Sequence, residues 1–142
     1  MKTKNKLHTT NYFDTFIEVA EDSKAVRGEV PKSKKDKKTI AELQFELLVK
    51  NPYKYTSDDI FFKIFALRND LIKAELEQAK KDFFSKGQAC FRASLLPKKY
   101  GFGVHCDHEG KVAIFGMETE AYQKFFQDPK LKKLKAMRTS KK

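Results

Sequence analysis

The chain has few of the residues that mark several large classes of protein. Only two cysteines, Cys90 and Cys106, occur among its 142 residues, too few for the disulfide framework of a small secreted domain. Tryptophan is absent, and glycine and proline number only six and four, which excludes collagen-like and low-complexity sequences. No apolar run approaches the roughly 18 residues of a membrane span, and the basic N-terminal residues lack the apolar segment of a signal peptide. We therefore expect a cytoplasmic protein with no membrane partner.

Apolar residues are nevertheless abundant. They make up 40% of the chain and include 13 Phe and 5 Tyr, enough to form one compact core. A length of 142 residues fits one domain. We expect a single domain over residues 1–142 with an ordered core over about residues 8–134.

The net charge of +11 is unevenly distributed. Residues 1–6, 32–38 and 130–142 carry net charges of +3, +4 and +7, so the rest of the chain is mildly acidic. We expect the N-terminus, the 32–38 loop and the C-terminal tail to be flexible. Basic tails attract nucleic acid only weakly and nonspecifically, in contrast to a basic face on the folded body.

Hydrophobic patterns predict the elements of the first half of the chain. Alternation predicts a strand over residues 12–20, followed by a polar loop over 21–38. A capping box, Thr39 to Glu42, begins a helix that Asn51-Pro52 ends. Residues 60–68 fit a strand or a helix capped by Ser57-Asp58-Asp59, and their Phe and Ile content favours the strand. A helix follows over about residues 71–86, with Asp70 as its cap and Gly87 after its end.

The second half is predicted to contain more strands. Strands are expected over residues 89–95, 101–107 and 111–117, and a helix over about 119–127. Asp128-Pro129 is typical of a helix start, so we expect a second helical segment that Leu131 and Leu134 dock. This order of elements predicts an α+β fold, with a mainly antiparallel sheet of about five strands and helices packed on one face.

The segment GFGVHCDHEG, residues 101–110, gathers two histidines, a cysteine and an aspartate. Asp107-His108-Glu109-Gly110 is typical of a type I turn with a left-handed glycine. Pairing Asp107 with Lys111 places Cys106 opposite Val112, Val104 opposite Ile114 and Phe102 opposite Gly116, with the large apolar residues of the first strand on one side. His105 and Cys106 then point to opposite faces, which leaves too few ligands for a metal site. We expect no metal and no cofactor, and we expect both cysteines to be small buried hydrophobic residues.

Gly101, Gly103 and His105 share the other face of this strand. Glycine in a strand often marks the close approach of a ligand, so the two glycines and His105 are candidate binding residues. The competing interpretation is that an aromatic residue such as Phe115 covers the glycines.

Two further polar clusters are candidates for binding. The first is His8-Thr-Thr-Asn-Tyr12, whose alternative interpretation is a cap or turn network. The second contains Arg92, Ser94, Lys98, Lys99 and Tyr100, in which Arg92 and Ser94 could bind an anion; an ordinary solvated face is the alternative. The chain contains no glycine-rich phosphate loop, HExxH or GxSxG pattern.

Seven motifs in the chain carry a resemblance to a known family: HTTNY (8–12), TFIEVAED (15–22), KTIAELQFE (38–46), NPYKYTSDD (51–59), FFSKGQACFR (83–92), KKYGFGVH (98–105) and EGKVAIFG (109–116). Together they span nearly the whole chain, which resembles a family of small uncharacterised bacterial proteins, a domain of unknown function. The family usually has proline and tryptophan where this chain has Ala89 and Phe102. The resemblance implies a cytosolic single domain and implies no activity.

Three hypotheses for function follow. The first is a non-enzymatic binding protein for a small polar or anionic ligand, with a site formed by His8, Asn11, Arg92, Tyr100, Gly101, Gly103 and His105. The second is a small enzyme in which His105 is the general base, oriented by Asp107 or Tyr100. The third is weak, nonspecific nucleic-acid binding through the lysine-rich segments.

Overall fold

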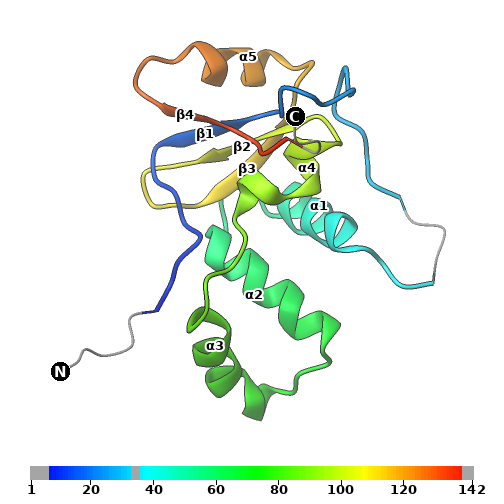
Figure 1. The fold of residues 1–142 in the computed structure, drawn as a ribbon, viewed down its shortest axis with the longest axis vertical. Coiled ribbons are helices and arrows are strands. Elements are labelled where there is room, and N and C mark those ends of the chain that lie inside the picture. The colour runs from blue at the N-terminus through cyan, green and yellow to red at the C-terminus, as the bar shows by residue number, and fades with distance from the viewer. Residues whose placement is uncertain (1–6, 33–35, 139–142) are drawn as a thin grey trace.

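The structure of the protein, a computed structural model, describes residues 7–32 and 36–138. Its centre is a sheet in the order β3-β2-β1-β4, formed by β1 (Thr15–Glu18), β2 (Phe102–Cys106), β3 (Val112–Gly116) and β4 (Lys132–Lys135) (Figure 1). β2 is antiparallel to both β1 and β3, whereas β4 is parallel to β1. The α+β class is confirmed, and the prediction of about five mainly antiparallel strands is corrected to a mixed sheet of four strands within the described residues.

Helices cover both faces of the sheet. The helix α5 (Glu120–Gln127) lies over one face, and α1 (Ile40–Lys50) and the short α4 (Leu95–Lys98) lie over the other (Figure 1). On this second side, α2 (Ser57–Arg68) leads away from the sheet to α3 (Leu76–Phe84). The prediction of helices on one face only was therefore wrong. It placed no helix opposite the alternate side chains of β1, such as Phe16, which is fully buried.

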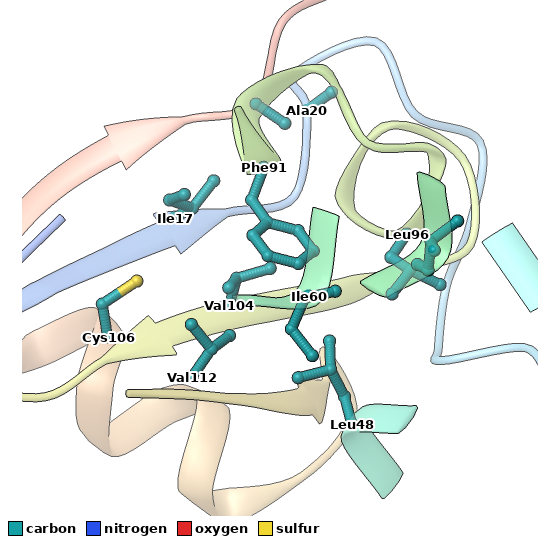
Figure 2. Close-up of a cluster of buried hydrophobic side chains, with 11 residues drawn as sticks. Ile17, Ala20, Leu48, Ile60, Phe91, Leu96, Val104, Cys106 and Val112 are labelled. Carbon is teal, nitrogen blue, oxygen red and sulfur yellow. The ribbon is translucent and has the colours of Figure 1, made fainter. Parts of the chain in front are cut away.

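Each face of the sheet has its own hydrophobic core. The larger core joins Ile17, Val104, Cys106 and Val112 of the sheet to buried residues of the helical side, including Leu48 (Figure 2). The smaller core consists of Phe16, Val19 and Tyr122, with partly buried residues of α5 and β3 around it. All four residues of β1 are buried, because this strand is interior to the sheet and covered on both faces. The observed β1 is shorter than the predicted strand over residues 12–20.

The locally encoded elements form as predicted. Thr39 and Glu42 form the capping box at the start of α1. The β2–β3 hairpin has the predicted register, with Val104 opposite Ile114 and Cys106 opposite Val112. Gly110 has a left-handed φ of 83° at the end of the turn. Thr119 caps α5 by accepting a hydrogen bond from the amide of Tyr122.

The strand predicted over residues 60–68 is a helix. α2 spans Ser57–Arg68 and begins with a capping box of Thr56 and Asp59. Ile60 is fully buried in the larger core, while Phe62 contacts Phe83 of α3 with ring centroids 5.8 Å apart. Because α2 is packed on more than one side, its apolar residues do not form the single stripe that marks a helix in sequence.

Three further elements differ from prediction. The strand expected over 89–95 is a 3₁₀ turn, η2 (Phe91–Ala93), followed by α4. The helix expected over 71–86 consists of a 3₁₀ turn, η1 (Lys73–Glu75), and α3. The helical segment expected after Asp128-Pro129 is β4, because Lys132 to Lys135 pair with β1.

The polar loop lacks helix and strand over residues 21–32 and 36–38, as predicted, while residues 33–35 lie outside the described residues. Residues 1–6 and 139–142 of the lysine-rich ends also lie outside them. The basic C-terminal segment is not a tail throughout its length. It contributes β4, and Ala136 is buried at 4% exposure.

Candidate functional site

The HTTNY segment caps α2. The carboxylate of Asp58 accepts hydrogen bonds from the hydroxyl of Thr9 and from the amide and hydroxyl of Thr10, all at 2.7 Å. In return Asn11 accepts from the Asp58 amide at 2.9 Å. The cap-network interpretation of this motif is confirmed. Side-chain oxygens satisfy the free amides of a helix start in this way.

His8 and Asn11 attach the HTTNY segment to α3 and α2. The backbone amide of His8 donates to the carbonyl of Phe84 at 2.8 Å, and the His8 side chain is exposed. Asn11 uses its side-chain oxygen on Asp58. Neither residue lies on the face of β2 that carries His105.

The two cysteines differ in their surroundings, and the expectation that both are buried holds only for Cys106. Cys106 is fully buried, and burial raises the pKa of its thiol to about 12, which makes it a core residue and a poor nucleophile. Cys90 is partly buried and lies 3.2 Å from the hydroxyl of Tyr12. Burial and this contact raise the pKa of Tyr12 to about 12.

Arg92 and Tyr100 lie away from His105. The Nε of Arg92 donates to the carbonyl of Lys135 at 2.8 Å, and the amide of Met137 donates back to the Arg92 carbonyl, so Arg92 links η2 to β4. Tyr100 packs against the larger core. Phe91, the neighbour of Arg92 in η2, also belongs to the larger core, which places both candidates on the side of the sheet opposite α5.

The two candidate glycines are covered. A Cβ on Gly103 would lie 2.5 Å from the ring of Phe16 and 2.6 Å from that of Tyr122. Gly101 has a left-handed φ of 77° and lies against the carbonyl of Arg27. Aromatic residues cover Gly103, as the competing interpretation held, although they are Phe16 and Tyr122 and not Phe115.

His105 is held by aromatic residues. Its Nδ1 lies 2.7 Å from the hydroxyl of Tyr53, and its ring stacks on Phe125 with centroids 4.1 Å apart. Burial lowers the pKa of His105, and the nearby carboxylates of Asp107, Asp14 and Asp128 oppose this only in part. Burial also raises the pKa of Tyr53 to about 12. The pair is therefore neutral near pH 7, and Tyr53, not Asp107 or Tyr100, orients the imidazole.

The seven candidate residues thus do not form one site. Gly103 and His105 share the face under α5, while Arg92 and Tyr100 lie on the other side of the sheet. His8 and Asn11 lie beside α2 and α3, and Gly101 lies against the carbonyl of Arg27. Their separation follows from the sheet, which divides the two cores.

A pocket lies elsewhere, between α1, α2 and residues 88–95. Its volume is about 410 Å³, within the range of about 300–1,000 Å³ usual for small-molecule sites. We name it the α1/α2 pocket. Its walls are mainly apolar, formed by Ile40, Phe61, Ile64, Phe65, Phe83 and Leu95, among others. The polar groups that line it include Gln44, Arg68, Asn69, Gln88, Cys90 and Ser94.

Sequence reasoning missed this pocket because residues from several separate segments form it. One signal was present. Gln44 lies at helical spacing between Ala41 and Leu48 on the buried face of α1, where a polar residue is unusual. Its side-chain oxygen accepts from the hydroxyl of Ser94 at 2.6 Å, so the two polar residues form a pair within the apolar wall.

The described residues contain neither a candidate metal-binding cluster nor a helix that could span a membrane. No group of three or more His, Cys, Asp or Glu residues within 7–32 and 36–138 could hold a metal ion. None of the helices in these ranges is both long and apolar enough to cross a bilayer.

Comparison with known proteins gives a family and no activity. No curated protein matches the chain, and no solved structure matches it. Residues 7–142 match the sequence model of a family described as a family of unknown function (DUF6157), which confirms the resemblance seen in the sequence motifs. Since the match spans almost the entire chain, the protein belongs to this family of unknown function.

Proposed function

We propose that the protein is a non-enzymatic binding protein for a small organic ligand, and that the α1/α2 pocket is its site. The observation that supports this is the pocket itself, an apolar hollow of about 410 Å³ with a few polar groups in its walls. Sites of this composition bury most of a small ligand's surface and orient it by a few hydrogen bonds. The walls favour a ligand that is mainly apolar with a polar group, which differs from the polar or anionic ligand expected beside His105.

The pocket is favoured over a catalytic His105 because Phe125 stacks on the imidazole ring and because the hydrogen bond to Tyr53 leaves Nε2 available as a base in only one tautomer. If the Tyr53 hydroxyl donates to Nδ1, the neutral ring carries its proton on Nε2 and has no free lone pair for a substrate proton. Catalysis would require the opposite tautomer, with Nδ1 donating to Tyr53. His105 also does not line the α1/α2 pocket.

Blocking the pocket tests the proposal. Ala89 lines the pocket and is exposed, so Ala89→Trp places an indole at the entrance with little cost to the fold. The matched control is Ala74→Trp, at an exposed alanine of η1 that does not line the pocket. The wild-type protein and both variants are screened against a library of small apolar molecules by thermal shift.

A ligand present at ten times its Kd stabilises the folded state by about 1.4 kcal/mol, which is about 5 °C in Tm for a domain of this size. We expect compounds that stabilise the wild-type protein and the control but not Ala89→Trp. Equal shifts in all three proteins would place ligand binding outside the pocket and refute the proposal.

A further inference from the structure

Gln44 is a polar side chain in the wall of the α1/α2 pocket, on the buried face of α1. It is only 2% exposed. Its Oε1 accepts the Ser94 hydroxyl proton at 2.6 Å, while the Ser94 oxygen accepts from the Leu96 amide at 3.1 Å. With Ser94 donating its single hydroxyl proton to Oε1, the amide nitrogen of Gln44 is turned away from Ser94.

The other end of this amide has no partner. Within the described part of the chain, Nε2 of Gln44 makes no hydrogen bond. No fully enclosed side-chain nitrogen or oxygen of the described residues lacks a partner, so Nε2 must border open space. Gln44 lines the α1/α2 pocket, and that pocket is the open space beside it.

An unpaired amide donor in a mainly apolar hollow selects for a ligand acceptor, because a buried polar group without a hydrogen bond is costly. Gln44 carries no charge. The cation among the lining residues is Arg68, which is exposed at the C-terminal end of α2. A carboxylate placed against Gln44 would lose its hydration without gaining a buried cation, whereas a neutral carbonyl loses much less.

We propose that Gln44 Nε2 donates a hydrogen bond to the carbonyl oxygen of a small, uncharged, mainly apolar ligand in the α1/α2 pocket. This inference rests on the proposed function. The apolar walls bind the hydrocarbon part of the ligand, and Gln44 distinguishes a carbonyl compound from a hydrocarbon of the same shape.

Three probes of nearly the same shape test the inference. They are the ketone 4-phenyl-2-butanone, the hydrocarbon isopentylbenzene and the anion 3-phenylpropanoate. Each is titrated into ¹⁵N-labelled full-length protein, and the side-chain NH₂ resonances of Gln44 are followed by NMR. We expect the ketone to move these resonances downfield, because a new hydrogen bond shifts an amide proton in that direction. We expect the hydrocarbon to produce no such downfield shift.

A variant supplies the second readout. Gln44→Met keeps the length of the side chain and removes the donor. It should weaken binding of the ketone by up to about tenfold, since a hydrogen bond contributes up to about 1.5 kcal/mol, while the hydrocarbon binds equally or more tightly. Gln44→Met also removes the acceptor of Ser94, so the double variant Gln44→Met/Ser94→Ala, without either polar group, is measured alongside it. The wild-type NMR titration does not depend on either variant folding.

The outcomes separate this inference from the proposed function. Suppose that the ketone and the hydrocarbon both bind, that Ala89→Trp prevents their binding and that Gln44→Met lowers the affinity of both equally. The pocket is then a binding site and the role of Gln44 is refuted. The same conclusion follows if the ketone leaves the Gln44 resonances in place, as it would if water occupied the donor. Tighter binding of 3-phenylpropanoate refutes an uncharged ligand. If no probe binds at millimolar concentration, both the pocket proposal and the role of Gln44 fail.

Discussion

Substituting Gly103 tests whether the packing of the sheet against α5 excludes any ligand from the glycines. In Gly103→Ala the new Cβ would lie 2.5 Å from the Phe16 ring and 2.6 Å from the Tyr122 ring, distances that no packed carbon atoms tolerate. Phe16 is fully buried and Tyr122 is 6% exposed, so neither ring can move into solvent. Tyr122 is further held by a hydrogen bond that its hydroxyl accepts from the Val19 amide at 2.9 Å.

The magnitude follows from these contacts. Overpacking a core by one carbon typically costs about 1–3 kcal/mol, and weakening the Tyr122 hydrogen bond adds up to about 1 kcal/mol. Replacing glycine by alanine in a strand returns about 0.5–1 kcal/mol of backbone entropy. We therefore expect Gly103→Ala to destabilise the protein by about 1–3 kcal/mol, or roughly 3–10 °C in Tm for a domain of this size.

The assay is urea denaturation with a matched glycine control. A Cβ on Gly87 would meet only Nδ1 of His8, at 4.0 Å, and Gly87 does not have a left-handed φ. Gly87→Ala should therefore be neutral or stabilise by up to about 1 kcal/mol. If Gly103→Ala were as stable as Gly87→Ala, the rings would not cover Gly103 and a ligand approach there would again be open.

Three other predictions concern the polar clusters. Burial lowers the pKa of His105 below its ordinary value of 6.5, so the unfolded chain binds the proton more readily and stability is lost as the pH falls below about 6.5. His105→Asn does not titrate at this position and should reduce the loss of stability between pH 7 and 5, measured by chemical denaturation. An unchanged dependence of stability on pH would contradict this prediction. Asp58→Ala removes three hydrogen bonds and should lower the free energy of unfolding in urea by about 2–3 kcal/mol. The control Asp59→Ala, which removes the capping box of α2, should lower it by about 1 kcal/mol. Equal losses of stability would refute the role of the Asp58 network. If the lysine-rich ends bind nucleic acid, deleting residues 139–142, with two lysines, should reduce the slope of log K against log salt concentration by up to about 2, measured by fluorescence anisotropy. Deleting residues 130–142 would also remove β4 and is unsuitable as a test.

Local signals in the sequence predicted the elements that depend on local chemistry. The α1 capping box and the β2–β3 register were correct because neighbouring residues decide a cap and a hairpin. The strand β4 was missed because it consists of Lys132-Lys133-Leu134-Lys135 and forms by parallel pairing with β1 more than 100 residues away in sequence. The preceding Asp128-Pro129 resembles a helix start, and nothing local contradicts that interpretation.

The candidate site failed for a related reason. The sequence placed Gly103 and His105 on one strand face correctly. It contained no indication that α5 would cover that face, because the contact of Phe125 with His105 joins separate elements. Likewise, the pairing of Tyr53 with His105 depends on the loop before α2 reaching the edge of β3, where the Tyr53 amide donates to the Val112 carbonyl at 3.0 Å.

The conspicuous polar residues of this chain are therefore mostly partners of one another. Asp58 accepts hydrogen bonds from the HTTNY segment, Tyr53 is hydrogen-bonded to His105, and Arg92 links η2 to β4. A side chain whose hydrogen-bonding capacity is used within the fold has little left for a ligand. Gln44, whose only sequence signal was its spacing on the buried face of α1, is buried with its amide donor unused and lies beside an open pocket. Unused hydrogen-bonding capacity is a property of the folded chain, so it indicates this site more directly than the residue type and spacing of Gln44 do in the sequence.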